Sequence, residues 1–377
     1  MPVNDGTPAL HGRAFIGDAI QDDILVVIRD GAIASIDQVA KPPRDAVRVD
    51  GVIVPGFIDV HVHGGNGADF MDADPDRNRS IVAFHARHGT TALMATTLSA
   101  SRPDLRNAIA AMRGIDGIAG IHLEGPYINE RRAGAQDRAS IRVPDPHELG
   151  EFLAMAPDSR WMMTIAPELP GAHQLIAQFR DRVLFSIGHT NGSHAETVAA
   201  LEWGAQHFTH LFNAMTPFNH REPGVAGAAL ASSSATAELI ADGIHVHPAA
   251  LWIAARALPY RIALVTDAMR ACGLSDGTYK LYEHEVTVSE GAARLADGTL
   301  AGSVLTMDAA VKNMVELAGL PIEYVLPLAS AVPAKIAGVA DRKGRIAAGY
   351  DADLAVLNER LECERVLVRG HEVGDVR

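Results

Sequence analysis

Histidine pairs at the end of an apolar run are residues that could bind a metal. His61 and His63 close the run PGFIDVHVHG, and alternate residues of a strand face the same side. Two imidazoles at one strand end chelate a divalent cation well. A lone histidine in a strand is usually a buried polar residue, but that alternative explains a His-x-His pair poorly. The spacing therefore predicts that His61 and His63 bind a metal.

Three further ligand-type residues lie in other apolar runs. Glu124 ends IAGIHLEG, His189 lies in VLFSIGHT and His210 lies in THLFNAM. An ionised carboxylate is costly to bury alone, and a divalent cation would stabilise it; the alternative is an exposed loop carboxylate. One glutamate and two histidines from separate strands match a catalytic zinc site with an open position for water.

Polar residues near other runs could act on a substrate. Asp267 follows IALVT, where it could take a proton from a metal-activated water; the alternative is a helix N-cap. Arg221, in the loop HREPG, suits a phosphate, although a surface arginine is normally only solvated. His245, in DGIH, offers a second polar contact.

The elements that position these residues read as eight strands separated by amphipathic helices. Eight strand–helix units predict an α/β fold, a (β/α)₈ barrel of TIM type, whose active site lies at the carboxyl ends of its strands. The alternative is an open, doubly wound sheet. The expected strands are residues 52–63, 90–97, 118–125, 161–168, 183–190, 206–212, 235–242 and 262–269.

The two ends of the chain have a different texture, with short β-branched runs separated by Gly and Asp. Neither end contains a helix-length amphipathic segment. We expect residues 1–52 and 343–377 to pair into one small β-sandwich domain, with residues 53–342 forming the barrel.

Composition limits the classes of function. The 377 residues carry a formal net charge of −13, which disfavours a nucleic-acid surface. No run of 18 apolar residues predicts a spanning helix, and the first residues lack a signal-peptide pattern. The two cysteines, Cys272 and Cys363, fit a reducing compartment. These features predict a cytoplasmic protein that binds neither nucleic acid nor membrane.

Several motifs together resemble one family. PGFIDVHVHG, HLEGPYIN, IGHT, THLFNAM, REPGVAG, IADGIHVHP, VTDAM and GTLAGSVLTM are similar, in this order, to motifs of the N-acetylglucosamine-6-phosphate deacetylases of the amidohydrolase superfamily. The resemblance covers almost the whole chain. It implies a hydrolase that removes acetate from an amino-sugar phosphate in amino-sugar catabolism.

The resemblance also implies roles for individual residues. Glu124, His189 and His210 would hold the main metal, most simply Zn²⁺, with Fe²⁺ or another divalent ion as alternatives. His61 and His63 would hold a second ion, with Glu124 as a bridge, and Asp267 would be the general base and acid. The resemblance further implies a homodimer in which Arg221 reaches the neighbouring active site. Contacts to the sugar or its phosphate would come from Ala135, Asn213, Ala214, Arg221, His245, Leu300, Ala301 and Gly302.

Gln136 departs from the family pattern, which has a histidine here that polarises the acetamide carbonyl. The Gln136 amide can donate a hydrogen bond to the developing oxyanion but carries no positive charge, and a charged donor is about twice as strong. Three alternatives follow. The enzyme is slower on the usual substrate, its substrate differs, for example a galacto epimer, or the position was engineered.

Two other functions compete with the deacetylase. Cyclic-amide hydrolases of the superfamily often bridge two metals with a lysine on the fourth strand, but WMMTIAPE has none. A sugar-phosphate binding protein with weakened catalysis is suggested only by Gln136. The complete ligand set and Asp267 oppose that second alternative.

Overall fold

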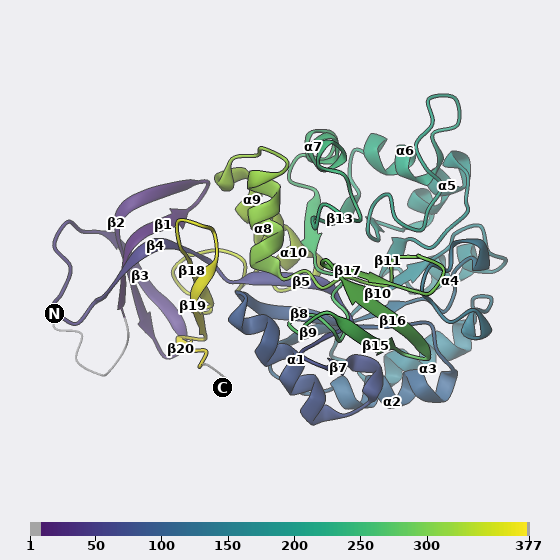
Figure 1. Cartoon of the computed structure of the whole chain (residues 1–377), viewed down its shortest axis with the longest axis horizontal. Coiled ribbons are helices and arrows are strands. Elements are labelled where there is room, and N and C mark those ends of the chain that lie inside the picture. The colour runs from purple at the N-terminus through teal and green to yellow at the C-terminus, as the bar shows by residue number, and fades with distance from the viewer. Residues whose placement is uncertain (1–8, 375–377) are drawn as a thin grey trace.

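A computed structural model describes residues 9–374 of the chain. It contains a barrel surrounded by helices and a smaller sheet built from both ends of the chain. This smaller sheet lies beside the barrel (Figure 1). Among the described residues, no helix is long and apolar enough to cross a membrane.

Eight strands form the barrel, and each pairs in parallel with its neighbour, which confirms the predicted architecture. The first and last strands also meet at their ends, because the Asp267 N–H donates to the His61 carbonyl (2.9 Å) and the His63 N–H to the Ala268 carbonyl (2.9 Å). In chain order the strands are β5 (Phe57–Val62), β8 (Thr90–Thr97), β9 (Ile118–Glu124), β10 (Arg160–Ile165), β11 (Val183–Ile187), β12 (His207–Phe208), β13 (Thr236–Ile240) and β14 (Ile262–Val265).

Helices cover the outside of the barrel, and several of them begin at a side chain that caps the first turn. The Asp74 carboxylate accepts backbone N–H groups at the start of α1, and Ser193 with Glu196 forms a capping box at the start of α5. The helices are α1 (Pro75–Arg87), α2 (Arg102–Met112), α3 (Pro146–Met155), α4 (Ala172–Phe179), α5 (His194–Trp203), α6 (Gly224–Ala231), α7 (Pro248–Ala257), α8 (Met307–Glu316), α9 (Ile322–Ala329) and α10 (Ala331–Ile336). Short 3₁₀ turns are η1 (Phe70–Asp72), η2 (Glu130–Arg132) and η3 (Arg138–Ser140).

The ends of the chain pair into one seven-stranded sheet, as the sequence predicted. The sheet curves around its own apolar core. Two hydrogen bonds join its N-terminal and C-terminal segments: the Ile33 N–H donates to the Tyr350 carbonyl (2.8 Å), and the Ala352 N–H donates to the Gly31 carbonyl (2.9 Å). Its strands are β1 (Ala9–Ile16), β2 (Ala19–Arg29), β3 (Ala32–Gln38), β4 (Val47–Pro55), β18 (Leu354–Leu357), β19 (Cys363–Val368) and β20 (His371–Glu372).

The predicted single strand over residues 52–63 is wrong. The chain leaves the small sheet with β4 and enters the barrel with β5, and Gly56 separates the two. A Cβ on Gly56 would lie 2.3 Å from the Thr91 hydroxyl oxygen, so only glycine fits this crossing. The sequence is continuously apolar on both sides of Gly56, so it does not indicate that the chain passes from one sheet to the other there.

Residues 270–306 contain a small sheet to which the sequence analysis assigned no element. It consists of β15 (Gly277–Leu281), β16 (His284–Ser289) and β17 (Ala292–Arg294). Its buried side chains pack with Leu98 and Met269 near the carboxyl ends of the barrel strands. A two-stranded ribbon, β6 (Gly64–Gly65) and β7 (Ala68–Asp69), follows β5 directly.

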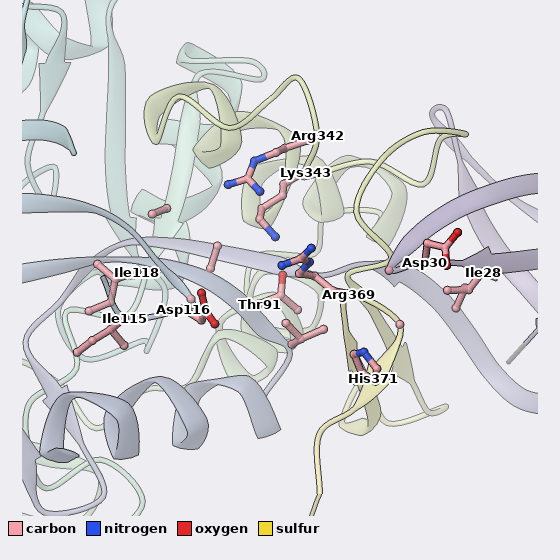
Figure 2. Close-up of a pocket in the computed structure, with 16 residues that line it drawn as sticks. Ile28, Asp30, Thr91, Ile115, Asp116, Ile118, Arg342, Lys343, Arg369 and His371 are labelled. Carbon is pink, nitrogen blue, oxygen red and sulfur yellow. The ribbon is translucent and has the colours of Figure 1, made fainter. Parts of the chain in front are cut away.

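A cleft of about 870 Å³ separates the small sheet from the barrel (Figure 2). The barrel side includes Thr91 at the start of β8 and Ile118 at the start of β9, so the cleft lies at the end opposite the carboxyl ends of the barrel strands. Lys343 pairs with Asp351 (2.9 Å) and with Asp353. These ion pairs hold the returning chain against the small sheet, which is a structural role.

Candidate active site

The predicted ligands converge at the carboxyl ends of the barrel strands. His61 lies in β5, Glu124 ends β9, and His189, His210 and Asp267 each follow a strand by two residues. All are buried. His189, His210 and Asp267 have positive φ angles of 46°, 26° and 49°, a conformation that non-glycine residues rarely adopt. Such strain concentrates at functional sites and here turns the side chains inward.

Glu124 and two histidines form the first ligand cluster. The Glu124 Oε1 atom lies 3.0 Å from Nε2 of His189 and 3.0 Å from Nε2 of His210. The two Nε2 atoms lie 3.1 Å apart. Three ligand atoms from three strands therefore point at one small volume, as the sequence predicted.

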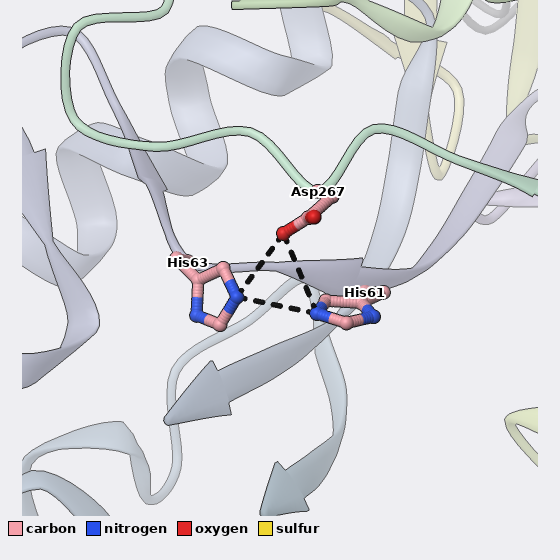
Figure 3. Close-up of side chains that lie close together, drawn as sticks. All are labelled: His61, His63 and Asp267. Atoms are coloured by element: carbon pink, nitrogen blue, oxygen red, sulfur yellow. Dashed lines mark hydrogen bonds and ion pairs between the residues drawn. The ribbon is translucent and has the colours of Figure 1, made fainter. Parts of the chain in front are cut away.

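His61, His63 and Asp267 form a second cluster (Figure 3). The two histidine Nε2 atoms lie 3.2 Å apart, and the Asp267 Oδ1 atom lies 3.5 Å from Nε2 of His61 and 3.2 Å from Nε2 of His63. Glu124 joins the clusters, because its Oε1 lies 3.5 Å from Nε2 of His61 and its Oε2 lies 3.2 Å from Nε2 of His63. The arrangement can bind one or two ions.

The histidine lone pairs fit a cation. The Nδ1 atom of His189 lies 2.7 Å from the Arg132 carbonyl and donates to it, so Nε2 of a neutral His189 carries a lone pair. That lone pair faces Nε2 of His210 at 3.1 Å. Two such atoms at this distance need a proton or a cation between them. The donor set, with imidazole and carboxylate ligands, is one that divalent transition metals prefer.

The charges of the site favour the same conclusion. Burial alone would raise the pKa of Glu124, but the imidazoles, above all His61 and His189, hold that pKa well below its usual range. Burial would lower the pKa of His63, but its contacts with Asp267 and Glu124 raise that pKa to about 9. Without an ion, the carboxylates thus attract protons to His61 and His63. A divalent cation would replace those protons.

Glu238, in the middle of β13, orients two ligands and was missed in the sequence. Its Oε2 atom lies 2.8 Å from Nδ1 of His61 and accepts the His210 N–H at 2.9 Å. Its Oε1 atom lies 3.2 Å from Nε2 of His207. A carboxylate on Nδ1 leaves Nε2 of His61 free to bind a metal. The signal was a lone acidic residue inside the apolar run ATAELIAD.

Asp59 is a second buried carboxylate that the sequence analysis left without a role. It accepts the Thr266 hydroxyl and the His61 N–H, the latter at 3.1 Å. Burial raises the pKa of Asp59 to about 7. Asp59 thus links the strand that carries His61 to the turn that carries Asp267.

Gln136 lies at the edge of the ligand set with a fixed amide orientation. Its Oε1 atom accepts the Ser99 N–H at 2.6 Å, and its Nε2 atom donates to Oε2 of Glu124. The backbone donor of Ser99 requires an oxygen at that position, so the NH₂ group must face the site. One N–H supports Glu124, and the second is available to a substrate carbonyl.

A pocket of about 300 Å³ opens over these groups. Most of the predicted substrate contacts line it, while His61 lies beneath its surface. Ala301 is buried with Met269 behind the wall, and Arg221 is exposed on a loop outside the lining. The predicted residues in the lining are His63, Glu124, Ala135, Gln136, His189, His210, Asn213, Ala214, His245, Asp267, Leu300 and Gly302.

Further lining residues were absent from the sequence prediction. Arg131 and Arg132 belong to η2, and Leu281 comes from β15 of the additional sheet. The two arginines had a signal, because they follow HLEGPYINE closely in the chain. Leu281 had none, since its sheet packs over the site only in three dimensions.

Comparisons with known proteins agree with this architecture and show the family of the chain. Residues 52–373 match the model of the amidohydrolase family. The chain is 38% identical over 363 residues to the N-acetylglucosamine-6-phosphate deacetylase of Bacillus subtilis, covering 92% of this chain and 91% of that protein. It is 37% identical to the N-acetylgalactosamine-6-phosphate deacetylase of Escherichia coli O157:H7, with 93% and 94% covered. The structure of the N-acetyl-D-glucosamine-6-phosphate deacetylase of Mycobacterium smegmatis superposes with a TM-score of 0.92 at 36% identity, covering 97% and 99%.

Proposed function

Because this chain belongs to the amidohydrolase family and, within it, to the N-acetylglucosamine-6-phosphate deacetylases, we propose that it hydrolyses the acetamide of N-acetylglucosamine 6-phosphate. The products are glucosamine 6-phosphate and acetate, in amino-sugar catabolism. One observation carries this proposal: the ligand atoms of Glu124, His189 and His210 all lie within 4.8 Å of one another. Asp267 lies close to them, with its Oδ1 atom 3.2 Å from Nε2 of His63.

Glu124, His189 and His210 would hold the main ion, for which Zn²⁺ is the best match to a His₂Glu set. Fe²⁺ or another divalent ion is the alternative. His61 and His63 would hold a second ion. A bound divalent ion lowers the pKa of a water molecule and polarises a carbonyl oxygen.

Asp267 is positioned to move the protons of the reaction. Burial would raise the pKa of Asp267, but His61 and His63 hold it below its usual range, so the carboxylate is ionised at neutral pH. It accepts the proton of the attacking water at a carboxylate oxygen and delivers it to the leaving nitrogen as the C–N bond breaks. The Gln136 amide donates to the oxygen on which negative charge develops.

The remaining pocket residues would bind the sugar and its phosphate. His245 is oriented by Asp242, whose Oδ2 lies 2.6 Å from Nδ1 of His245, so Nε2 donates to a phosphate oxygen when the ring carries both protons. Asn213, Ala214 and Ala135, with the turn Leu300, Ala301 and Gly302, would surround the sugar. Arg221 would reach the active site of a neighbouring subunit in a homodimer. The proposed location of this enzyme is the cytoplasm.

Acetate release from N-acetylglucosamine 6-phosphate, with the galacto and manno epimers in parallel, tests the function. The Asp267→Asn variant should lose about 10²–10⁴-fold in kcat while binding at least one ion per chain. Asp308→Asn, a partly buried carboxylate outside the pocket, is the matched control and should keep its activity. Full turnover by Asp267→Asn would contradict the proposed role of Asp267.

A further inference from the structure

The pocket contains two arginines that the ligand set does not explain. Its carboxylates, Glu124 and Asp267, lie among the metal ligands, whereas its arginines, Arg131 and Arg132, are both carried by η2. Arg131 is exposed and Arg132 is half-buried. The chain as a whole carries a net charge of −13, so a local cationic group is needed to attract an anion.

The turn that carries the arginines is rigidly attached to the active site. The Asn129 side chain caps η2 and also donates to Oε1 of Glu168 at 2.9 Å, and the Asn129 N–H donates to the His189 carbonyl at 2.8 Å. The Arg132 carbonyl accepts Nδ1–H of His189. A metal ligand and the arginine pair thus keep a fixed relative position, as a substrate with two recognised ends requires.

The guanidinium groups retain capacity for a ligand. Within residues 9–374, no hydrogen bond or ion pair engages the Arg131 guanidinium, and Arg132 uses only Nε, which donates to Oδ1 of Asn191 at 3.2 Å. Both nitrogens at the tip of Arg132 remain for a second partner. Guanidinium groups bind phosphate oxygens through paired hydrogen bonds.

We propose that Arg131 and Arg132 bind the substrate's 6-phosphate within the same chain and so determine the preference for phosphorylated amino sugars. This inference rests on the proposed function and gives it a specificity determinant that lies outside the predicted pair Arg221 and His245. His245 lines the same pocket and would supply a third donor when its ring carries both protons. Phosphate recognition then has a cationic component in a single subunit, whether or not a partner's loop adds to it.

The test compares Arg131→Ala and Arg132→Ala with wild type and with Arg113→Ala, an exposed arginine at the end of α2. We expect each active-site variant to raise KM for N-acetylglucosamine 6-phosphate about tenfold or more, with kcat less affected. Calorimetry of product binding supplies a second readout. The variants should weaken binding of glucosamine 6-phosphate but leave the weak binding of glucosamine unchanged. Arg131→Lys, which keeps the charge, should restore part of the affinity.

Three outcomes would overturn the inference. Unchanged KM and product affinity in both alanine variants would do so, as would equal losses with glucosamine and its 6-phosphate. A phosphate preference lost in Arg221→Ala but kept in both active-site variants would assign recognition to the partner's loop instead. Wild-type protein that releases no acetate from any sugar phosphate would contradict the proposed function itself, and is thus distinguishable.

Discussion

The Gln136 amide has a fixed orientation although it carries no charge. Ser99 fixes the oxygen end, so the NH₂ end faces Glu124 and the substrate position. A neutral donor of this kind keeps the same charge over the whole pH range in which a histidine would titrate. The hydrogen bond that we propose to the developing oxyanion would therefore be weaker than that of an imidazolium but independent of pH.

Removing the Gln136 donor should slow the chemical step. We expect Gln136→Leu to lower kcat about 100-fold, comparable to the loss of one oxyanion donor in other hydrolases. Gln136→His, which keeps an N–H donor, is the matched variant and should retain or exceed wild-type kcat below the pKa of the new imidazole. Steady-state acetate release gives both values. Wild-type kcat in the leucine variant would exclude this role.

At the scale of elements, Glu238 of β13 connects the strands that carry His61 and His210. In Glu238→Gln, an NH₂ group must replace one oxygen and face a donor. We expect affinity for the ion at His61 and His63 to fall about 10–100-fold, as for other residues that orient metal ligands. Metal content after dialysis against a graded chelator measures this. Glu148→Gln, another buried carboxylate but outside the site, should retain its metal.

Helix α1 is fastened to the segment after β5 by a buried histidine. Nε2 of His85 lies 2.9 Å from the Gly64 carbonyl, and burial lowers the pKa of His85 from 6.5 to about 4. Between these values the unfolded chain binds a proton that the folded chain does not. This group's contribution to stability is therefore intact above pH 6.5 and is lost as the pH falls toward 4.

His85→Gln should reduce that acid sensitivity, since its amide can still donate to Gly64. Between pH 7.5 and 5, the free energy of unfolding should fall about 2 kcal/mol less in the variant than in wild type. Urea unfolding at both pH values measures the difference, with His371→Gln, an exposed position on β20, as the control. If the free energy of unfolding fell by the same amount between the two pH values in all three proteins, the result would contradict a neutral, buried His85.

The sequence predicts those strands and ligands whose local residue pattern differs from that of their surroundings. Barrel strands such as TTALMATT are buried along their whole length and read as continuous apolar runs, as strands of parallel sheets do. Ligands at strand ends were found because polar residues interrupt such runs. Gly56 was missed as a boundary, because the second half of β4 and all of β5 are buried, and the residues directly on both sides of Gly56 are apolar. Leu281 could not be assigned, since its place at the pocket depends on packing between distant segments.

At the scale of the molecule, the small sheet and the active site lie at opposite ends of the barrel. Beside the cleft between sheet and barrel, buried charges are paired, as Lys343 is with Asp353. At the opposite end of the barrel, several buried imidazoles and carboxylates lie close together, and the stability of the fold does not require this arrangement. Buried groups of one kind that face each other destabilise a fold unless an ion compensates them. We therefore assign the concentration of histidines to metal binding rather than to stability.

The most direct measurement is acetate release from N-acetylglucosamine 6-phosphate by one preparation before chelation, after chelation and after stepwise addition of Zn²⁺, with metal content determined at each step. We expect activity to disappear with the metal and to return as one or two ions per chain are bound. Protein shown to be free of metal that still releases acetate at the original rate would contradict the metal-dependent mechanism.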